Sequence, residues 1–283
     1  MRAFAQLVAE ADGRGGTRLA VLRGEPPLLL RRTGPHLGGG VTVHLVGGAA
    51  GPLRGDDLRL EIEVGPYARL ELRSVAASLA LPGRADEPPS RLEIHAVVAE
   101  GASLRWLPEP LIAAAGCHHV VVTDVCVASG GSLLWRDDLV CGRHGEPSGA
   151  VRTDTTMRYD GQTLYRHQLA VGPGAPGWSG AAVLGNGRAV GSVVLAGPEL
   201  AGLELAGSQP AGPQPAGSQP ARSQPAGPGL PRGVLLGGDA ALMALAGPGM
   251  LATAVGADIR VVRAALDPVQ SRTSSCRVQE LTL

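Results

Sequence analysis

Hydrophobic and polar residues alternate with a period of two along much of the first 170 residues. The clearest segments are 41–45, 58–64, 68–73, 91–97 and 101–106. Successive side chains of a strand point to opposite faces, so this alternation is typical of strands with one buried and one solvated face. Turn residues at Gly65-Pro66 and Gly101 separate the segments. The pattern therefore predicts half-buried antiparallel strands joined by hairpins.

The alternation continues to residue 169. It covers 120–127, 132–136, 149–159 and 163–169, with a turn at 129–131. Asp160-Gly161 joins two strand-like segments, and this dipeptide is a strong hairpin signal.

Helical patterns are confined to the region after residue 238. Asp239 can cap a helix through Leu245, ended by Gly247-Pro248. The short apolar segments 250–255 and 261–266 fit either a helix or a strand. The predicted fold is mainly β: an elongated antiparallel β-sandwich or β-helix-like body with a few short helices near the C-terminus.

A pentapeptide repeat rich in Pro, Gly, Ser and Gln occupies residues 206–230. Proline removes backbone donors and the repeat has few apolar residues, so ordering it would cost more entropy than packing could offset. We expect a β-rich body at 1–205, a flexible surface insertion at 206–230, and a C-terminal part of the same domain at 231–283.

Composition excludes several kinds of function. The chain has 283 residues, with 25 basic and 25 acidic side chains in balance, so no global field favours nucleic acid or a membrane surface. All basic residues are arginine, which excludes Schiff-base chemistry and a P-loop lysine. Few aromatics are present for base stacking, and no apolar segment is long enough to cross a membrane. We expect a cytoplasmic protein with reduced thiols.

Candidate chemistry appears first at residues 105–119, which contain Glu109, Cys117, His118 and His119. Adjacent histidines on a strand point to opposite faces, so one metal ion cannot easily take both. One histidine together with Glu109 or Cys117 could make a transient metal contact. The favoured interpretation is an ordinary loop followed by the start of a strand.

Two further segments allow a site. Cys141, His144 and Glu146 could ligate a divalent ion, or form a polar loop that faces a partner. Ser179 could be a hydrolase nucleophile, with a histidine and an aspartate drawn from His144, His167, Asp154 and Asp160. However, Ala181 stands where the second glycine of a nucleophile elbow belongs, which argues against that alternative.

Five segments in the same order resemble the motifs of the urease accessory protein UreD (UreH) family. They are Ala50–Leu58, Val64–Leu70, Ser74–Ser78, Glu100–Pro108 and Cys141–Arg143. Two positions depart from the family: Ala50 replaces a glycine, and Val75–Leu79 lacks the amide and the cation of a Gln-Ala-Ala-Thr-Lys stretch. The sequence is similar to a divergent, actinobacterial-type branch.

The resemblance implies a scaffold without catalysis and an elongated, mostly β fold. Such proteins bind the urease apoprotein and recruit the accessory proteins UreF and the GTPase UreG, so that Ni(II) reaches the urease active site. No tightly bound cofactor is implied, although Ni(II) could pass transiently along polar residues that face the interior.

The resemblance also implies the residues to examine. Asp56, Glu109, Arg143 and His144 are candidates for contacts with partners or with the nickel path, and Asp56 could equally be an acceptor within its own turn. Gly51, Gly55, Gly65 and Pro66 are expected to shape turns. The metal candidates are Cys117, His118, His119 and Cys141.

Overall fold

Two β-sheets form the body of the protein in its computed structural model, which describes residues 1–200, 235–237 and 239–275. Sheet A has the order β14 (Gln162–Val171), β13 (Ala150–Tyr159), β11 (His118–Val127), β8 (Ser90–Val98), β5 (Asp57–Val64), β1 (Arg2–Ala11) and β2 (Thr17–Gly24). Sheet B has the order β16 (Leu235–Gly237), β17 (Ala240–Ala244), β18 (Gly249–Gly256), β15 (Ala189–Ala196), β12 (Ser132–Cys141), β9 (Ser103–Leu107), β6 (Arg69–Ser74), β4 (Gly40–Gly47) and β3 (Leu28–His36).

Short elements complete the described chain. The strands β7 (Ser78–Ala80) and β10 (Leu111–Ala113) pair with each other beside β12. Two 3-10 turns are η1 (Leu37–Gly39) and η2 (Pro198–Leu200), and the helix α1 spans Ile259–Ser275.

Strand direction corrects part of the predicted fold. The neighbours β1, β5, β8, β11 and β13 pair in parallel within sheet A. Likewise β4, β6, β9 and β12 pair in parallel within sheet B. In sheet A the antiparallel pairs are β1–β2 and β13–β14 at the two edges. In sheet B they are β3–β4 at one edge and all the pairs from β16 through β17, β18 and β15 to β12, which form about half of the sheet. The mainly β, β-helix-like body is confirmed, but the expected antiparallel pairing is wrong for the strands from β1 to β13 in sheet A and from β4 to β12 in sheet B.

The turns explain the parallel pairing, because they carry the chain between sheets instead of closing hairpins. The turn at Gly65-Pro66 links β5 of sheet A to β6 of sheet B, and Ala68 donates to the Gly65 carbonyl at 3.1 Å. The turns at 99–102 and 128–131 make the same passage from β8 to β9 and from β11 to β12. One strand of sheet A and the following strand of sheet B together form a coil, as β5–β6, β8–β9 and β11–β12 do. Each coil stacks on the previous coil with its strands running in the same directions.

The Asp160-Gly161 hairpin is confirmed. It joins β13 to β14 in an antiparallel pair at the edge of sheet A. Both turn residues have positive φ, 49° and 73°, which is the backbone conformation of a two-residue hairpin turn.

The main core lies between the inner faces of the two sheets. It is aliphatic, as the scarcity of aromatic residues requires, and contains fully buried side chains such as Leu7, Leu60 and Leu104. Trp106 and Trp135 of adjacent strands stack there with ring centroids 5.0 Å apart. Stacked aromatic rings of this kind add stabilisation beyond that of the surface area they bury.

The C-terminal region differs from the predicted short helices. Residues 240–244, expected within a helix from Asp239 to Leu245, form β17 and pair in register with β18. Pairing at the sheet edge overrides the local helical signal. The segment 250–255 lies within β18, and 261–266 lies within the 17-residue helix α1. The segment 206–230 lies outside the described residues.

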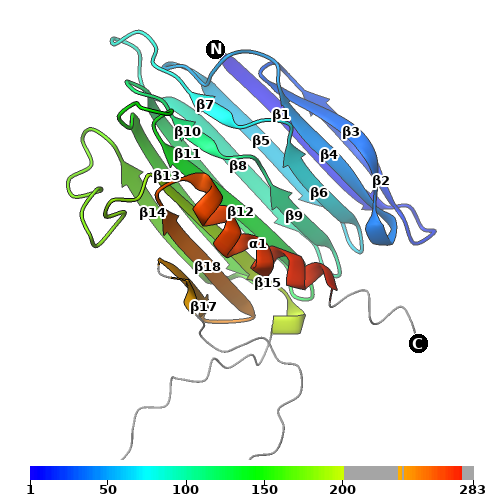
Figure 1. Cartoon of the computed structure of the whole chain (residues 1–283). Coiled ribbons are helices and arrows are strands. Elements are labelled where there is room, and N and C mark those ends of the chain that lie inside the picture. Colours follow the sequence, from blue (N-terminus) through cyan, green and yellow to red (C-terminus); the bar gives the residue numbers. More distant parts are fainter. Residues whose placement is uncertain (201–234, 238, 276–283) are drawn as a thin grey trace, which may run out of the picture.

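Helix α1 covers part of the outer face of sheet B, over β12, β15 and β18 (Figure 1). Asp258 caps it, because its Oδ1 accepts the backbone N–H groups of Arg260 and Val261 at 2.8 and 3.2 Å. Val262, Leu266 and Val269 recur at helical spacing and are buried in a second core against the sheet.

Candidate functional site

One end of the space between the sheets is polar rather than aliphatic. Asp56, Ser90 and His119 lie there, exposed by 4%, 1% and 1%. Ser90 and His119 are partners in the parallel pair β8–β11, and Ser90 Oγ lies 2.9 Å from His119 Nδ1. Asp56 Oδ2 accepts the Leu53 N–H at 2.8 Å, and its other oxygen is paired with the Met1 ammonium group. Asp56 thus fixes its own turn and faces a buried polar cluster.

The two adjacent histidines point to opposite faces, as predicted: His118 is exposed and His119 is buried. Desolvation lowers the pKa of His119 to about 4, against a weaker opposing effect of the Ser90 hydrogen bond and the Asp56 charge. The folded protein therefore holds the His119 imidazole neutral near pH 7, with one unprotonated ring nitrogen able to accept a hydrogen bond or to ligate a metal ion.

We expect His119 to make the folded state less stable as the pH falls from about 6.5 to about 4. The unfolded chain binds the imidazole proton near pH 6.5, but the folded chain binds it only near pH 4. Between these two pH values the unfolded state binds more protons than the folded state. The free energy of unfolding is therefore higher by about 3 kcal/mol above pH 6.5 than near pH 4, and this contribution of His119 is lost on acidification. Denaturant unfolding of the wild type and of His119→Gln at several pH values measures the difference.

Other titrating groups cancel in that comparison because both proteins contain them. Asp137 is the important one, since its raised pKa gives the opposite pH dependence. The prediction fails if the stability difference between the two proteins is the same at pH 4 and pH 7.

Asp137 is a second carboxylate that faces the space between the sheets, where it is half-buried, and it was not among the residues predicted from the sequence. It follows Trp135 on the inner face of β12, and its two oxygens accept the indole N–H groups of Trp135 and Trp106 at 2.8 and 3.4 Å. Burial raises its pKa to about 6 although these donors oppose the rise. The available signal was alternation, because Leu133, Trp135 and Asp137 fall on one face and place an acid at a core position.

Sheet A presents polar side chains opposite Asp137. Thr123 and Thr155 are buried and paired across β11 and β13, and His167 of β14 pairs with Thr155. Tyr165 stacks on His167 at a centroid distance of 5.9 Å. Burial and the nearby Asp137 charge raise the Tyr165 pKa. We call Asp137, Thr123, Thr155 and Tyr165 the interior polar lane; His167 lies beside it, exposed on the edge strand β14.

These groups do not converge on one point. No group of three or more His, Cys, Asp and Glu side chains in the described ranges is arranged to hold a metal ion. The polar groups instead lie at separate places between the two sheets, with Asp56, Ser90 and His119 at one end and Asp137 beside Trp106 and Trp135. Such an arrangement can give a cation successive weak contacts, which suits passage better than a closed cage of ligands does.

Two glycines shape the turn that leads to Asp56. Gly51 and Gly55 have φ of 137° and 82°, in the region that favours glycine. A Cβ on Gly51 would lie 3.4 Å from Asp56 Oδ2, and one on Gly55 would lie 2.8 Å from Glu87 Oε2. Gly65 is buried at the sheet-to-sheet turn beside the exposed Pro66.

The cysteine candidates are buried near the same end of the body. Cys117 and Cys141 belong to a small apolar cluster with Ala113 and Val151. Desolvation raises the pKa of the Cys117 thiol to about 11 and also raises that of Cys141. Both thiols are therefore protonated at neutral pH, which is unfavourable for metal ligation or nucleophilic attack.

The remaining loop candidates lie on the surface. Arg143 forms a two-point ion pair with Glu146, with Nε 2.8 Å from Oε2, and the neighbouring His144 is exposed. Glu109 accepts a hydrogen bond from Arg263 of α1 at 2.8 Å. The structure therefore does not bring Glu109, Arg143 or His144 together with Asp56.

A charged network fixes α1 to the sheet beside Glu109. Arg136 donates from Nε to Asp138 Oδ2 at 2.9 Å and from one terminal nitrogen to Asp267 and Gln270 at 2.6 and 3.0 Å. Arg136 is 6% exposed and Asp138 fully buried. Arg263 Nε lies 3.5 Å from the same Asp138 oxygen.

The hydrolase alternative has no assembled site. In the part of the chain that the structure describes, Ser179 forms no hydrogen bond with a histidine or a carboxylate, and it lies in a turn-rich segment at 173–187. A nucleophile needs a base within hydrogen-bond reach.

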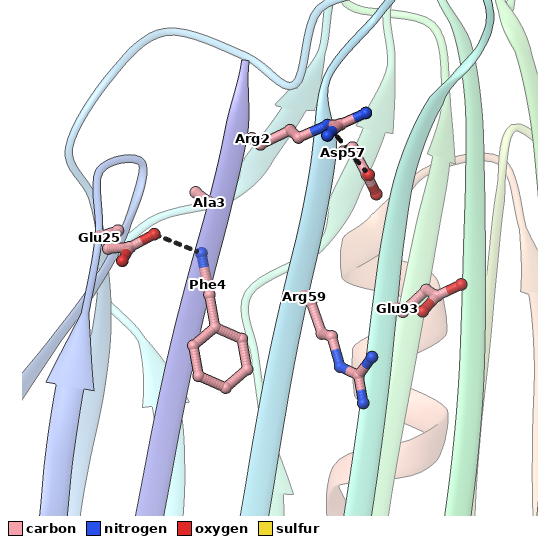
Figure 2. A pocket seen from close by; sticks show the side chains of 7 residues that line it. All are labelled: Arg2, Ala3, Phe4, Glu25, Asp57, Arg59 and Glu93. Carbon is pink, nitrogen blue, oxygen red and sulfur yellow. Dashed lines mark hydrogen bonds and ion pairs between the residues drawn. The ribbon is translucent and has the colours of Figure 1, made fainter.

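A cavity of about 280 Å³ opens on the outer face of sheet A, away from the interior polar lane (Figure 2). Figure 2 shows Arg2 beside Asp57, and the Phe4 N–H donating to Glu25 at 3.1 Å. The guanidinium and carboxylate groups that line the cavity largely neutralise one another, and no nucleophilic side chain lines the cavity. Across the described ranges, no helix is long and apolar enough to span a membrane.

Fold and site together define a β-solenoid-like protein whose distinctive chemistry lies in a polar interior. The family model of the UreD urease accessory protein matches residues 1–280, and the chain belongs to this family, which confirms the resemblance seen in the motifs.

Actinobacterial relatives agree with that assignment. The chain is 45% identical over 269 residues to urease accessory protein UreD 3 of Streptomyces griseus, covering 94% of this chain and 95% of the relative. It is 40% identical over 272 residues to urease accessory protein UreD of Streptomyces avermitilis, with 96% and 97% covered. It is 41% identical to the UreD protein of Streptomyces coelicolor over 268 residues, with 94% of each covered.

Proposed function

We propose that this protein is a urease accessory scaffold without catalytic activity of its own. It binds the urease apoprotein and recruits a UreF-like protein and a UreG-like GTPase, so that nickel is inserted into the urease active site. Family membership over residues 1–280 supports this role, as do relatives named urease accessory protein UreD that match along nearly their whole length.

The observation that carries the proposal is the polar interior. Asp56 and His119 are buried between the sheets, Asp137 is half-buried on the inner face of β12, and the hydroxyls of Thr123 and Thr155 are buried on sheet A. His167 adds an exposed imidazole at the edge strand β14. Nitrogen and oxygen ligands of this kind suit Ni(II). A succession of weak contacts would let the ion enter and leave, which a carrier needs and a resident metal site does not.

The protonation states of His119 and Asp137 suit contacts with Ni(II). His119 is neutral because burial lowers its pKa to about 4, and Asp137 is mostly ionised at pH 7 with a pKa of about 6. A cation approaching Asp137 would displace the remaining proton and stabilise the carboxylate.

The chain is proposed to act in the cytoplasm. Cys117, Cys126 and Cys141 are free thiols in the structure. Unpaired cysteines suit the reducing conditions of that compartment.

Deletion of the gene in a urease-positive host tests the role. We expect urease subunits to accumulate normally but to lack nickel and activity, and the wild-type gene to restore both. Nickel content of purified urease is the readout, with subunit abundance measured on the same samples. Fully nickel-loaded urease after deletion would show that the proposal is wrong.

Complementation with Asp137→Asn tests the interior path. The amide keeps the shape of the side chain and removes its charge, so we expect the nickel content of urease to fall by about tenfold, a common effect of altering a group near a metal. The matched control is Asp57→Asn, because Asp57 lies on the outer face of sheet A and is 57% exposed. Equal nickel contents with both variants would exclude Asp137 from the path.

A further inference from the structure

Helix α1 contacts β12, β15 and β18 on the outer face of sheet B (Figure 1). Within the described ranges, no other helix covers the continuation of this face over β3, β4, β6 and β9. Leu70, Leu72 and Leu104 point into the core, so the residues between them point outward.

The outward positions of these strands are strongly basic. The charged ones are four arginines and one glutamate: Arg31 of β3, Arg69, Glu71 and Arg73 of β6, and Arg105 of β9. We call these five residues the basic face. The chain as a whole is neutral, so this local excess of positive charge is balanced elsewhere.

The outer face of sheet A provides the contrast. Three of its arginines are matched with carboxylates at close range: Arg59 with Glu61 at 2.7 Å, Arg91 with Glu93 at 2.6 Å, and Arg158 with Asp124 at 2.9 Å. Arg31 and Arg69 of the basic face instead donate to backbone carbonyls. A carbonyl leaves the guanidinium charge uncompensated, so a field of one sign extends from the basic face.

Glu71 holds two of these arginines in fixed orientations. It is 6% exposed, and its two oxygens accept the Nε–H groups of Arg73 at 2.6 Å and Arg105 at 3.0 Å. Arg105 is its direct neighbour across β6 and β9. Among the described residues, neither arginine donates a further hydrogen bond, so the terminal nitrogens are oriented and available for paired contacts with a carboxylate.

We infer that the basic face is a docking site for an acidic surface of a protein partner. The inference rests on the proposed function, because it assigns a surface to one partner of the urease assembly. Pre-oriented guanidinium groups lose little freedom on binding and match carboxylates in geometry. The scarcity of aromatic side chains in the chain disfavours a single-stranded nucleic acid as the occupant.

The test compares full-length variants for binding to purified nickel-free urease apoprotein and, separately, to the UreF-like protein of the same host. Arg73→Glu reverses a charge on the basic face at a side chain that is 42% exposed. Arg31→Glu is a second variant at an exposed position and does not disturb the Glu71 pairs. Arg59→Glu on sheet A is the matched control, with a side chain 51% exposed.

We expect Arg73→Glu and Arg31→Glu to weaken binding to one of the two proteins by about tenfold or more, with Arg59→Glu close to wild type. Wild-type affinity should also fall between about 0.05 and 0.2 M salt, and the affinity of Arg73→Glu should fall less. Circular dichroism of each variant verifies its fold.

The inference is overturned if both basic-face variants bind as the wild type does, if the control loses as much affinity, or if a nucleic-acid fragment binds the basic face more tightly than either protein. A wild-type chain that binds neither protein would instead contradict the proposed function itself.

Discussion

The variant Trp135→Ala is expected to unfold with a free energy about 3–5 kcal/mol lower than that of the wild type. Trp135 is 1% exposed, stacks on Trp106 and donates its indole N–H to Asp137 at 2.8 Å. Alanine would leave a cavity between the sheets and remove a donor from a buried carboxylate. Denaturant unfolding followed by circular dichroism measures the loss.

Two further variants separate the effect of the cavity from the effect of the lost hydrogen-bond donor. Trp135→Phe keeps much of the ring volume and loses only the N–H donor, so a smaller loss of about 1–3 kcal/mol and a further rise in the pKa of Asp137 are expected. Val97→Ala, at a side chain 52% exposed, should stay within about 0.5 kcal/mol of the wild type. Equal losses for Trp135→Ala and Val97→Ala would contradict the packing described for the core.

The variant Arg136→Ala is also expected to have a free energy of unfolding about 3–5 kcal/mol lower than that of the wild type. The substitution would leave Asp138 fully buried with Arg263 Nε at 3.5 Å as its nearest cation, and it would break the link to Asp267 on α1. Faster amide hydrogen exchange along α1 should accompany the loss, because the network anchors the helix to β12.

The double variant Arg136→Ala/Asp138→Ala provides the check. Removing both partners also removes the uncompensated buried charge, so the double variant should be more stable than the sum of the single losses predicts. If the single and double losses simply add, the ion pair does not couple these residues and the prediction fails.

Local patterns explain what could be predicted from the sequence. Alternation identified the strands around Leu58, Arg69, Arg91 and Val120, and the Asp160-Gly161 turn was correctly predicted as a hairpin. Side-chain direction along a strand and the preference of glycine for positive φ are properties of a few consecutive residues. The same reasoning correctly placed His118 and His119 on opposite faces.

The candidate site was only partly predictable. Asp56 was found through its motif, and His119 through its neighbours in the sequence. Asp137 was missed because the predicted strand ended at Arg136, whereas β12 continues to Cys141. The segment 240–244 was expected to be helical, yet it is β17, because pairing with β18 satisfies its backbone hydrogen bonds at the sheet edge.

The sequence by itself determined that this is a mainly β protein with an aliphatic core, and its ordered motifs identified the UreD family. Only the tertiary structure decided that the central strands run parallel in stacked coils, since alternation is the same in parallel and antiparallel sheets. It also decided which polar residues meet: Asp56 with His119 at one end of the interior, and Asp137 with Trp106 farther along. Such contacts join residues far apart in the chain, and no local pattern specifies them.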